Sequence, residues 1–290
     1  MQIFLFFILL FCFLQPVLAD PVILLDERWL QGDNTNEGLA ARGWNGAPQE
    51  GSIGLAYIFV FDPQRNKTVL QINWDDSGNE APMGASALQH FLPTDQGQTA
   101  GGVTLYYTFK THDWFNQGAS GHSHFMRLLQ NYWDPNGGMG PAPNQLNLDI
   151  GGYGSDDYAT EYFDNTSFNA SRSIFFSGGT YASVAGYKTP DPTDYLVDDT
   201  WYIVRVFIQP QYYAGVPSGH IFGQIRRMDP PDPNHPDGWT TIIQADNVIL
   251  SDMGGVITQV AIGPYHNPAG NVPHQLFVGG VVIFQGFYMP

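Results

Sequence analysis

Short runs of hydrophobic residues with the character of β-strands recur along the chain, and helical periodicity is hard to find. Gly, Pro, Asn and Asp separate the runs, which is typical of hairpins and loops. Strands at such regular spacing predict a sandwich or a barrel. The predicted strands are Ile53–Phe61, Val69–Trp74, Val103–Lys110, Ser123–Leu129, Gln145–Ile150, Ser173–Phe176, Trp201–Ile208, Ile221–Arg227, Thr240–Ala245, Gln259–Ile262 and Gln275–Phe284.

Three of these strands, Val103–Lys110, Trp201–Ile208 and Ile221–Arg227, divide into an apolar face and a face that mixes polar and aromatic side chains. Side chains two apart in a strand share a face, so the apolar faces predict a core and the mixed faces a lined surface. We expect a broad curved sheet whose outer face forms a groove. Ligand contacts are predicted for mixed-face residues at the strand ends and centres, namely Lys110, Trp201, Arg205, His220, Gln224 and Arg226.

The first residues form an apolar run, Ile3–Leu14, followed by a small-residue cleavage point at Ala19. A run of this length suits a secretory signal peptide better than a membrane span, and an uncleaved anchor is the alternative. We therefore expect residues 1–19 to be a signal peptide and residues 20–290 to form one domain. The mature chain is therefore expected to be secreted, extracellular or periplasmic, without stable membrane insertion. The single cysteine, Cys12, lies in the signal peptide, so the mature chain is expected to have no disulfides.

Charge narrows the class of partner. The formal net charge is −16, from 11 Lys and Arg against 27 Asp and Glu, so phosphate electrostatics would oppose binding of nucleic acid. An anionic polysaccharide would also be repelled at long range, although a local basic patch can override that repulsion. Aromatic residues make up 14% of the chain, which suits a surface that stacks on sugar rings.

The stretch GHSHFMRLL, residues 121–129, carries the most conspicuous polar pattern. On a strand, His122 and His124 share one face and Arg127 lies on the other. Two histidines at this spacing are compatible with a metal ion, but no third ligand is evident, and a strand with hydrogen-bonding histidines is the alternative. We assign no metal to the pair and expect the two histidines to point into the groove beside Arg205 and Arg226.

A calcium ion is the one cofactor that the acidic residues suggest. Four aspartates gather in TPDPTDYLVDD, where their oxygens would suit Ca²⁺. The spacing of a defined calcium loop is missing, so a solvated turn is the alternative. The four residues are Asp191, Asp194, Asp198 and Asp199.

Several segments together resemble the concanavalin A-like lectin/glucanase superfamily, especially its secreted jelly-roll and polysaccharide-lyase-like members. They are DERWLQGDNTNEGLAARGWNG, VTLYYTFKTHDWFNQGASGHSHFMRLL, DDTWYIVRVFIQP, SGHIFGQIRR and HQLFVGGVVIFQG. The resemblance implies an all-β fold, a two-sheet antiparallel β-sandwich (jelly roll) with a concave groove. The chain departs from the family at two points: Asp149 stands alone where retaining hydrolysis needs a carboxylate pair, and Gly279-Gly280 replaces an acidic pair.

We expect this fold to bind a polysaccharide in the sheet groove, because no catalytic constellation can be located. The alternative is a polysaccharide lyase or glycoside hydrolase with dispersed catalytic residues, and a second alternative is an extracellular structural subunit. A lyase needs a cation to neutralise a uronate, a base for the C5 proton and an acid for the leaving oxygen. The candidates for these roles are Arg127, Arg205 or Arg226 as cation, His122 or His124 as base, and Tyr106 as acid.

Overall fold

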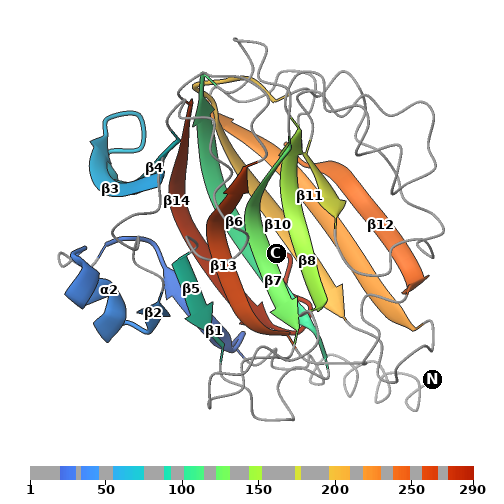
Figure 1. Ribbon diagram of the computed structural model, residues 1–290. Coiled ribbons are helices and arrows are strands. Elements are labelled where there is room, and N and C mark those ends of the chain that lie inside the picture. The colour runs from blue at the N-terminus through green and yellow to red at the C-terminus, as the bar shows by residue number, and fades with distance from the viewer. Residues whose placement is uncertain are drawn as a thin grey trace, which may run out of the picture.

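The computed structural model in Figure 1 describes most strands of the chain and some of their connections. The described residues are 20–30, 34–45, 55–74, 88–92, 101–113, 122–130, 144–151, 174–177, 196–209, 218–229, 238–248, 257–266 and 274–290.

The larger of two sheets holds eight strands, and we call it the large sheet. Strand β1 (Ile23–Glu27) pairs with one half of β14, and β4 pairs with the other half. The strands of the large sheet are, in order, β12 (Thr240–Val248), β11 (Gly219–Asp229), β10 (Trp201–Gln209), β6 (Val103–His112), β14 (His274–Gln285), β4 (Lys67–Trp74) and β3 (Leu55–Asp62).

The small sheet holds six strands and lies in front of the large sheet in Figure 1. Every strand pairing in both sheets is antiparallel among the described residues. The strands of the small sheet are β2 (Trp44–Asn45), β5 (Leu88–Phe91), β13 (Ile257–His266), β7 (His122–Gln130), β8 (Asn144–Gly151) and β9 (Ile174–Ser177). The fold is therefore the predicted two-sheet antiparallel β-sandwich.

The core lies between the two sheets, and strand alternation places side chains in it. In β6 and β10 every second residue is fully buried, including Leu105, Tyr107 and Val204. These side chains share one hydrophobic cluster with Val260 and Ile262 of β13 in the small sheet. The predicted apolar faces are thus confirmed, and the mixed faces of β6, β10 and β11 lie on the side of the large sheet away from the small one. We call that side the outer face.

All the strands predicted from the pattern are present, with ends that differ by a few residues. Four elements had no clear signal in the sequence: the strands β1, β2 and β5 and the helix α2 (Asn36–Ala41). The helix is too short to show a period, although its N-cap is a standard one, since the Gly38 N–H donates to Thr35 Oγ1 over 3.1 Å. No helix in the described part of the chain is long and apolar enough to cross a membrane.

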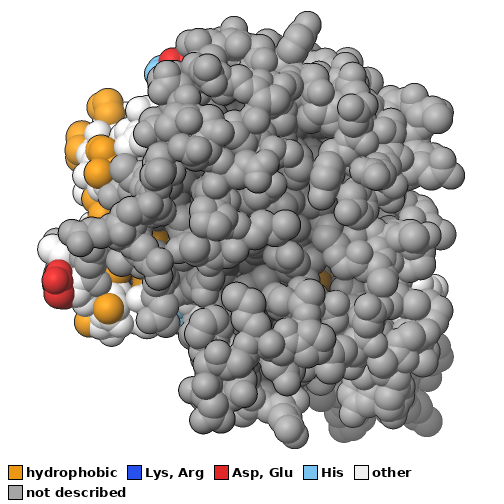
Figure 2. Space-filling model, in the orientation of Figure 1, with side chains coloured by type: hydrophobic (Ala, Val, Ile, Leu, Met, Phe, Trp, Pro, Cys, Tyr) orange, Lys and Arg blue, Asp and Glu red, His pale blue; other side chains and the backbone are white. Residues whose placement is uncertain are grey.

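Strand β3 is one of the two edge strands of the large sheet. Figure 2 shows hydrophobic side chains gathered along this side of the molecule. Ile58 and Phe61 of β3 are among the exposed large hydrophobic residues, at 43% and 63% of their full accessible surface.

A buried carboxylate, Glu27 at the end of β1, ties the large sheet to α2 and β2. Its two oxygens accept from the Trp29 N–H (3.0 Å), from Arg42 Nε (2.9 Å) and from the Trp44 indole (3.1 Å). Its side chain is 3% exposed, whereas that of neighbouring Asp26, paired with Arg28, is 39% exposed. A buried carboxylate with all its hydrogen bonds formed holds its neighbours far more firmly than an exposed pair does.

The two neighbouring carboxylates should therefore differ in their effect on stability. We predict that Glu27→Gln lowers the free energy of unfolding by about 2–4 kcal/mol, because it removes one partner of a buried ion pair. Asp26→Asn should change it by less than about 1 kcal/mol, since that pair faces water. Urea unfolding of both variants measures the difference. Equal losses of unfolding free energy would contradict the stabilising role of the buried Glu27 hydrogen bonds.

Candidate functional site

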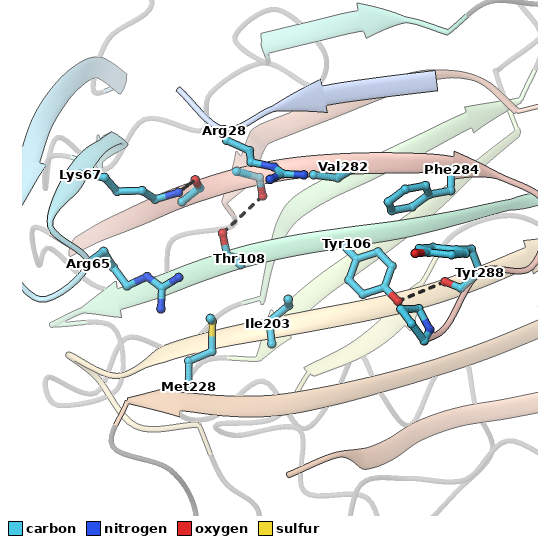
Figure 3. A pocket seen from close by; sticks show the side chains of 13 residues that line it. Arg28, Arg65, Lys67, Tyr106, Thr108, Ile203, Met228, Val282, Phe284 and Tyr288 are labelled. Carbon is cyan, nitrogen blue, oxygen red and sulfur yellow. Dashed lines mark hydrogen bonds between the residues drawn. The ribbon is translucent and has the colours of Figure 1, made fainter. Parts of the chain in front are cut away.

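A pocket of about 340 Å³ opens on the outer face of the large sheet (Figure 3). Its lining comes from β1's end, the β3–β4 turn, and strands β4, β6, β10, β11 and β14, together with the segment after β14. The lining residues are Arg28, Arg65, Lys67, Tyr106, Thr108, Ile203, Met228, Gly279, Gly280, Val282, Phe284, Tyr288 and Pro290.

Two glycines of β14 make the floor of the pocket. A methyl group on Gly279 would lie 2.5 Å from Thr108 Oγ1 and 3.1 Å from a ring carbon of Trp201, so only glycine fits there. The β6–β14 register shifts between Val278 and Gly280, which marks a bulge at the same point. Because glycine has no side chain, the backbone of β14 forms the floor directly and leaves the space of the pocket open above it.

The turn between β3 and β4 and the first residue of β4 supply two basic side chains of the pocket, Arg65 and Lys67. The Asp62 carboxylate accepts from the Arg65 N–H over 2.8 Å and from Lys110 Nζ over 2.5 Å. Asn66 takes a positive φ of 51°, a conformation that asparagine tolerates in turns. This geometry brings Arg65 and Lys67 to the pocket, where the Lys67 ammonium donates to the Gly279 carbonyl.

Positive charge dominates this end of the pocket. Arg28, Arg65 and Lys67 line it, and neither Asp nor Glu is present among the described lining residues. Burial lowers the pKa of Lys67, and the charges of Arg65 and Arg28 lower it further, while Asp62 partly opposes them. An anion in the pocket would relieve this repulsion between cations.

The Asp62 carboxylate beside these cations stays ionised to lower pH than usual. Burial alone would raise its pKa, but hydrogen bonds from Lys110 and from the Arg65 N–H outweigh burial, and the pKa is lowered. Because Lys110 is paired with Asp62 and its side chain is only 12% exposed, Asp62 mainly neutralises Lys110 and offsets the charge of Lys67 only in part.

Aromatic rings form the opposite wall, as Figure 3 shows. The ring of Tyr106 meets Phe284 edge-on at 5.7 Å between centroids, and Phe284 meets Tyr288 at 4.5 Å. Burial raises the pKa of the Tyr106 hydroxyl, and Arg205 offsets part of that rise. Tyr106 therefore keeps its proton at neutral pH and can act as a donor.

The segment Gly286–Pro290 folds back over β6 and β10 to complete this wall. The Tyr288 N–H donates to Thr104 Oγ1 over 2.9 Å, and the Tyr106 hydroxyl donates to the Tyr288 carbonyl over 3.1 Å. Arg205 Nη1 donates to the Pro290 main-chain oxygen over 3.0 Å. The segment therefore links Tyr106 of the pocket to Arg205 on the neighbouring strand.

The structure brings together most of the residues predicted on the mixed faces. Tyr106 lines the pocket, and Arg205 and Gln224 lie beside it, joined by a 2.8 Å hydrogen bond. Arg226 is on the same face of β11, and His220 Nδ1 lies 2.7 Å from Asp246 Oδ1 at the far end of that strand.

Two residues predicted to contact a ligand do not line the pocket. Trp201 has no exposed surface, because Lys110 and Arg65 lie over its ring at 5.2 and 5.8 Å. Lys110 is paired with Asp62 and does not line the pocket. The two residues support the pocket from beneath instead of lining it.

The placement expected for GHSHFMRLL is wrong. Strand β7, which carries His122, His124 and Arg127, belongs to the small sheet, on the other side of the core from Arg205 and Arg226. The alternation was read correctly, but it does not tell to which sheet a strand belongs. The side chains of the three residues lie outside the described part of the structure, so their roles stay predictions.

The aspartate cluster is only partly within the described residues, since Asp191 and Asp194 lie outside them. Asp199 takes a positive φ of 59° and lies 2.7 Å from His112 Nδ1 through its Oδ1. No group of three or more potential metal ligands occurs in the described ranges. Calcium binding stays a prediction.

Sequence reasoning did not find Arg28, Arg65 or Lys67. Arg28 lies in one segment and the other two in another, and the segments meet only because β1 and β4 pair with the same strand, β14. One signal was available: Gly279-Gly280 within a predicted strand indicates close backbone approach, and we interpreted it only as the loss of an acidic pair.

No protein-family model matches the chain, and no curated protein matches it in sequence. Among solved structures, it is similar to the alginate lyase vAL-1 from Chlorella virus, with a TM-score of 0.50 and 11% identity over 91% of this chain and 99% of that one. This chain has the concanavalin A-like jelly-roll fold.

Other structures with this jelly-roll fold match less well. The PL-14 alginate lyase from Aplysia kurodai gives a TM-score of 0.47 and 8% identity, covering 79% of this chain and 87% of that one. The exoplasmic/lumenal domain of VIP36 in its Ca²⁺/Man3GlcNAc-bound form gives 0.42 and 11%, covering 92% and 90%. At such identities the likeness extends to the fold alone.

The floor of the pocket gives a direct test with a matched control. We predict that Gly279→Ala lowers the free energy of unfolding by about 1–3 kcal/mol, because the added methyl group clashes with Thr108. Gly101→Ala meets no atom within 4 Å and should be neutral or stabilise slightly. Thermal unfolding compares the two variants. Full stability of Gly279→Ala would show that the floor is not closely packed.

Proposed function

We propose that this chain is a secreted carbohydrate-binding β-sandwich whose outer-face pocket holds a uronate-containing polysaccharide. The observation that carries the proposal is the cationic end of the pocket. Three of the 11 Lys and Arg residues of an acidic chain line one pocket, with neither Asp nor Glu among its described lining residues. A local cluster of this kind attracts a carboxylate at short range despite the net charge of −16.

The two ends of the pocket suit the two kinds of surface on a uronate. An arginine guanidinium, such as that of Arg28 or Arg65, can grip a carboxylate through two parallel hydrogen bonds. The Lys67 ammonium adds a charge that is already partly desolvated. The rings of Tyr106 and Tyr288 offer apolar area against which the C–H face of a sugar can pack.

Two further observations support a saccharide ligand outside the cell. The chain shares its fold with the alginate lyase vAL-1 from Chlorella virus, although fold alone does not determine function. The apolar run at Ile3–Leu14 has the length of a signal peptide, which favours secretion.

A second candidate is cleavage of the same polymer by β-elimination. It is favoured by the lowered pKa of Lys67, because an amine with a lowered pKa is more readily available as a base near neutral pH. In this reaction Lys67 would take the C5 proton, and the C4–O bond would break as a C4=C5 double bond forms. Tyr106 would protonate the leaving oxygen, while Arg28 or Arg65 neutralises the carboxylate.

Size-exclusion chromatography with polymers tests both candidates. The protein is incubated with polygalacturonate, alginate and hyaluronan, and with starch and xylan as neutral polymers. We predict co-elution with an intact uronate polymer and not with a neutral one. Lys67→Gln should weaken the affinity about tenfold, because it removes a charged hydrogen-bond donor.

Arg227→Gln is the matched control, because it removes the same unit of charge from β11. Its register partner is the core residue Tyr202, so Arg227 lies on the face opposite the pocket. Shortened polymer with the ultraviolet absorbance of unsaturated uronate would establish the second candidate. No interaction with any uronate polymer, or an equal effect of both variants, would contradict the proposed site.

A further inference from the structure

A second group of basic and aromatic side chains lies on the outer face beyond the pocket. Trp239, just before β12, packs against two guanidinium groups, with its ring centroid 4.0 Å from Arg205 Cζ and 4.8 Å from Arg226 Cζ. All three side chains are partly exposed. We call Arg205, Arg226 and Trp239 the Trp239 cluster.

Local structure fixes the cluster in place. Gly238 takes a positive φ of 72°, and a methyl group there would lie 2.6 Å from Arg226 Cδ, so the chain lies directly on the arginine stem. Arg205 Nε donates to Gln224 Oε1 over 2.8 Å, and Gln224 Nε2 donates to Thr241 Oγ1 over 3.4 Å. The side chains are therefore oriented before any ligand arrives, which lowers the entropic cost of binding.

Within the cluster, Arg226 carries a positive charge that its described surroundings do not neutralise. Within the described ranges Arg226 forms no ion pair, and its recorded contact is the indole of Trp239. A guanidinium that stacks on an aromatic ring uses its flat face and leaves its N–H edge for an acceptor. That edge suits a carboxylate.

The cluster is continuous with the pocket through Arg205. On β10, Arg205 is the register partner of Tyr106 on one side and of Gln224 on the other. It also holds the Pro290 oxygen in the wall of the pocket. Four strand spacings separate Lys67 on β4 from Arg226 on β11, a span of roughly 19 Å, so a ligand whose carboxylates reach both groups must be a chain of several sugar units.

We infer that the Trp239 cluster is a second subsite, which binds a further uronate unit of the polysaccharide chain held in the pocket. The Arg226 guanidinium edge binds its carboxylate, and the exposed part of the indole covers its ring. This inference rests on the proposed function of the pocket. Its consequence is selection by length, because only an oligomer long enough to span from Lys67 on β4 to Arg226 on β11 engages both groups.

Isothermal titration with size-fractionated galacturonate oligomers, from disaccharide to octasaccharide, tests the inference. The readout is the ratio of the affinity for the octasaccharide to that for the disaccharide, measured within each variant. The wild-type ratio is expected to be at least about tenfold, since one added charged contact supplies that much. Trp239→Ala and Arg226→Gln should each bring the ratio close to one, whereas Arg227→Gln should keep it.

The outcomes separate the two proposals. A wild-type ratio near one, or a ratio that survives in both Trp239→Ala and Arg226→Gln, overturns the second subsite while binding in the pocket stands. Absence of binding by every oligomer overturns the pocket and the subsite together. The melting temperature of each variant is recorded, and Arg226→Gln replaces Trp239→Ala as the deciding variant if removal of the indole unfolds the protein.

Discussion

The packing of two apolar sheet faces is the interaction on which the rest of this molecule depends. Leu105, Tyr107 and Val204 of the large sheet are fully buried in one cluster with Val260 and Ile262 of the small sheet. Because side chains alternate along a strand, burial of one set fixes the direction of the other. Tyr106 and Arg205 therefore lie on the outer face because their neighbours in β6 and β10 are buried in the core.

The outer face carries a cluster of positive charge, whereas the chain as a whole is negatively charged. The formal net charge is −16, yet Arg28, Arg65 and Lys67 share one pocket, and Arg205 and Arg226 extend the positive surface across β10 and β11. Screening by salt limits the reach of the overall negative charge to about 10 Å, whereas contacts in a partly buried pocket are screened much less. A uronate chain is thus opposed at long range and attracted on contact, which favours selectivity over speed of association.

The sequence predicted the sheet faces well and the pocket poorly, for physical reasons. A period of two is a local property, so the buried and outer faces of β6, β10 and β11 could be read from the residues. The pocket depends on which strands pair, and Arg28 and Lys67 meet only through β14. For the same reason the pattern could not show that the strand of His122 and His124 lies in the other sheet. Trp201 was expected to contact a ligand, but cations cover it.

The central claim is that a carboxylate, rather than sugar shape, is what the outer face recognises. Calorimetric titration with a uronate oligomer and with the same oligomer after reduction of its carboxyl groups to alcohols tests this most directly, because the two ligands differ in little else. We predict that the acidic oligomer binds and that added salt weakens its binding. The reduced oligomer should bind at least about a hundredfold more weakly. Equal affinity for both ligands, insensitive to salt, would contradict it.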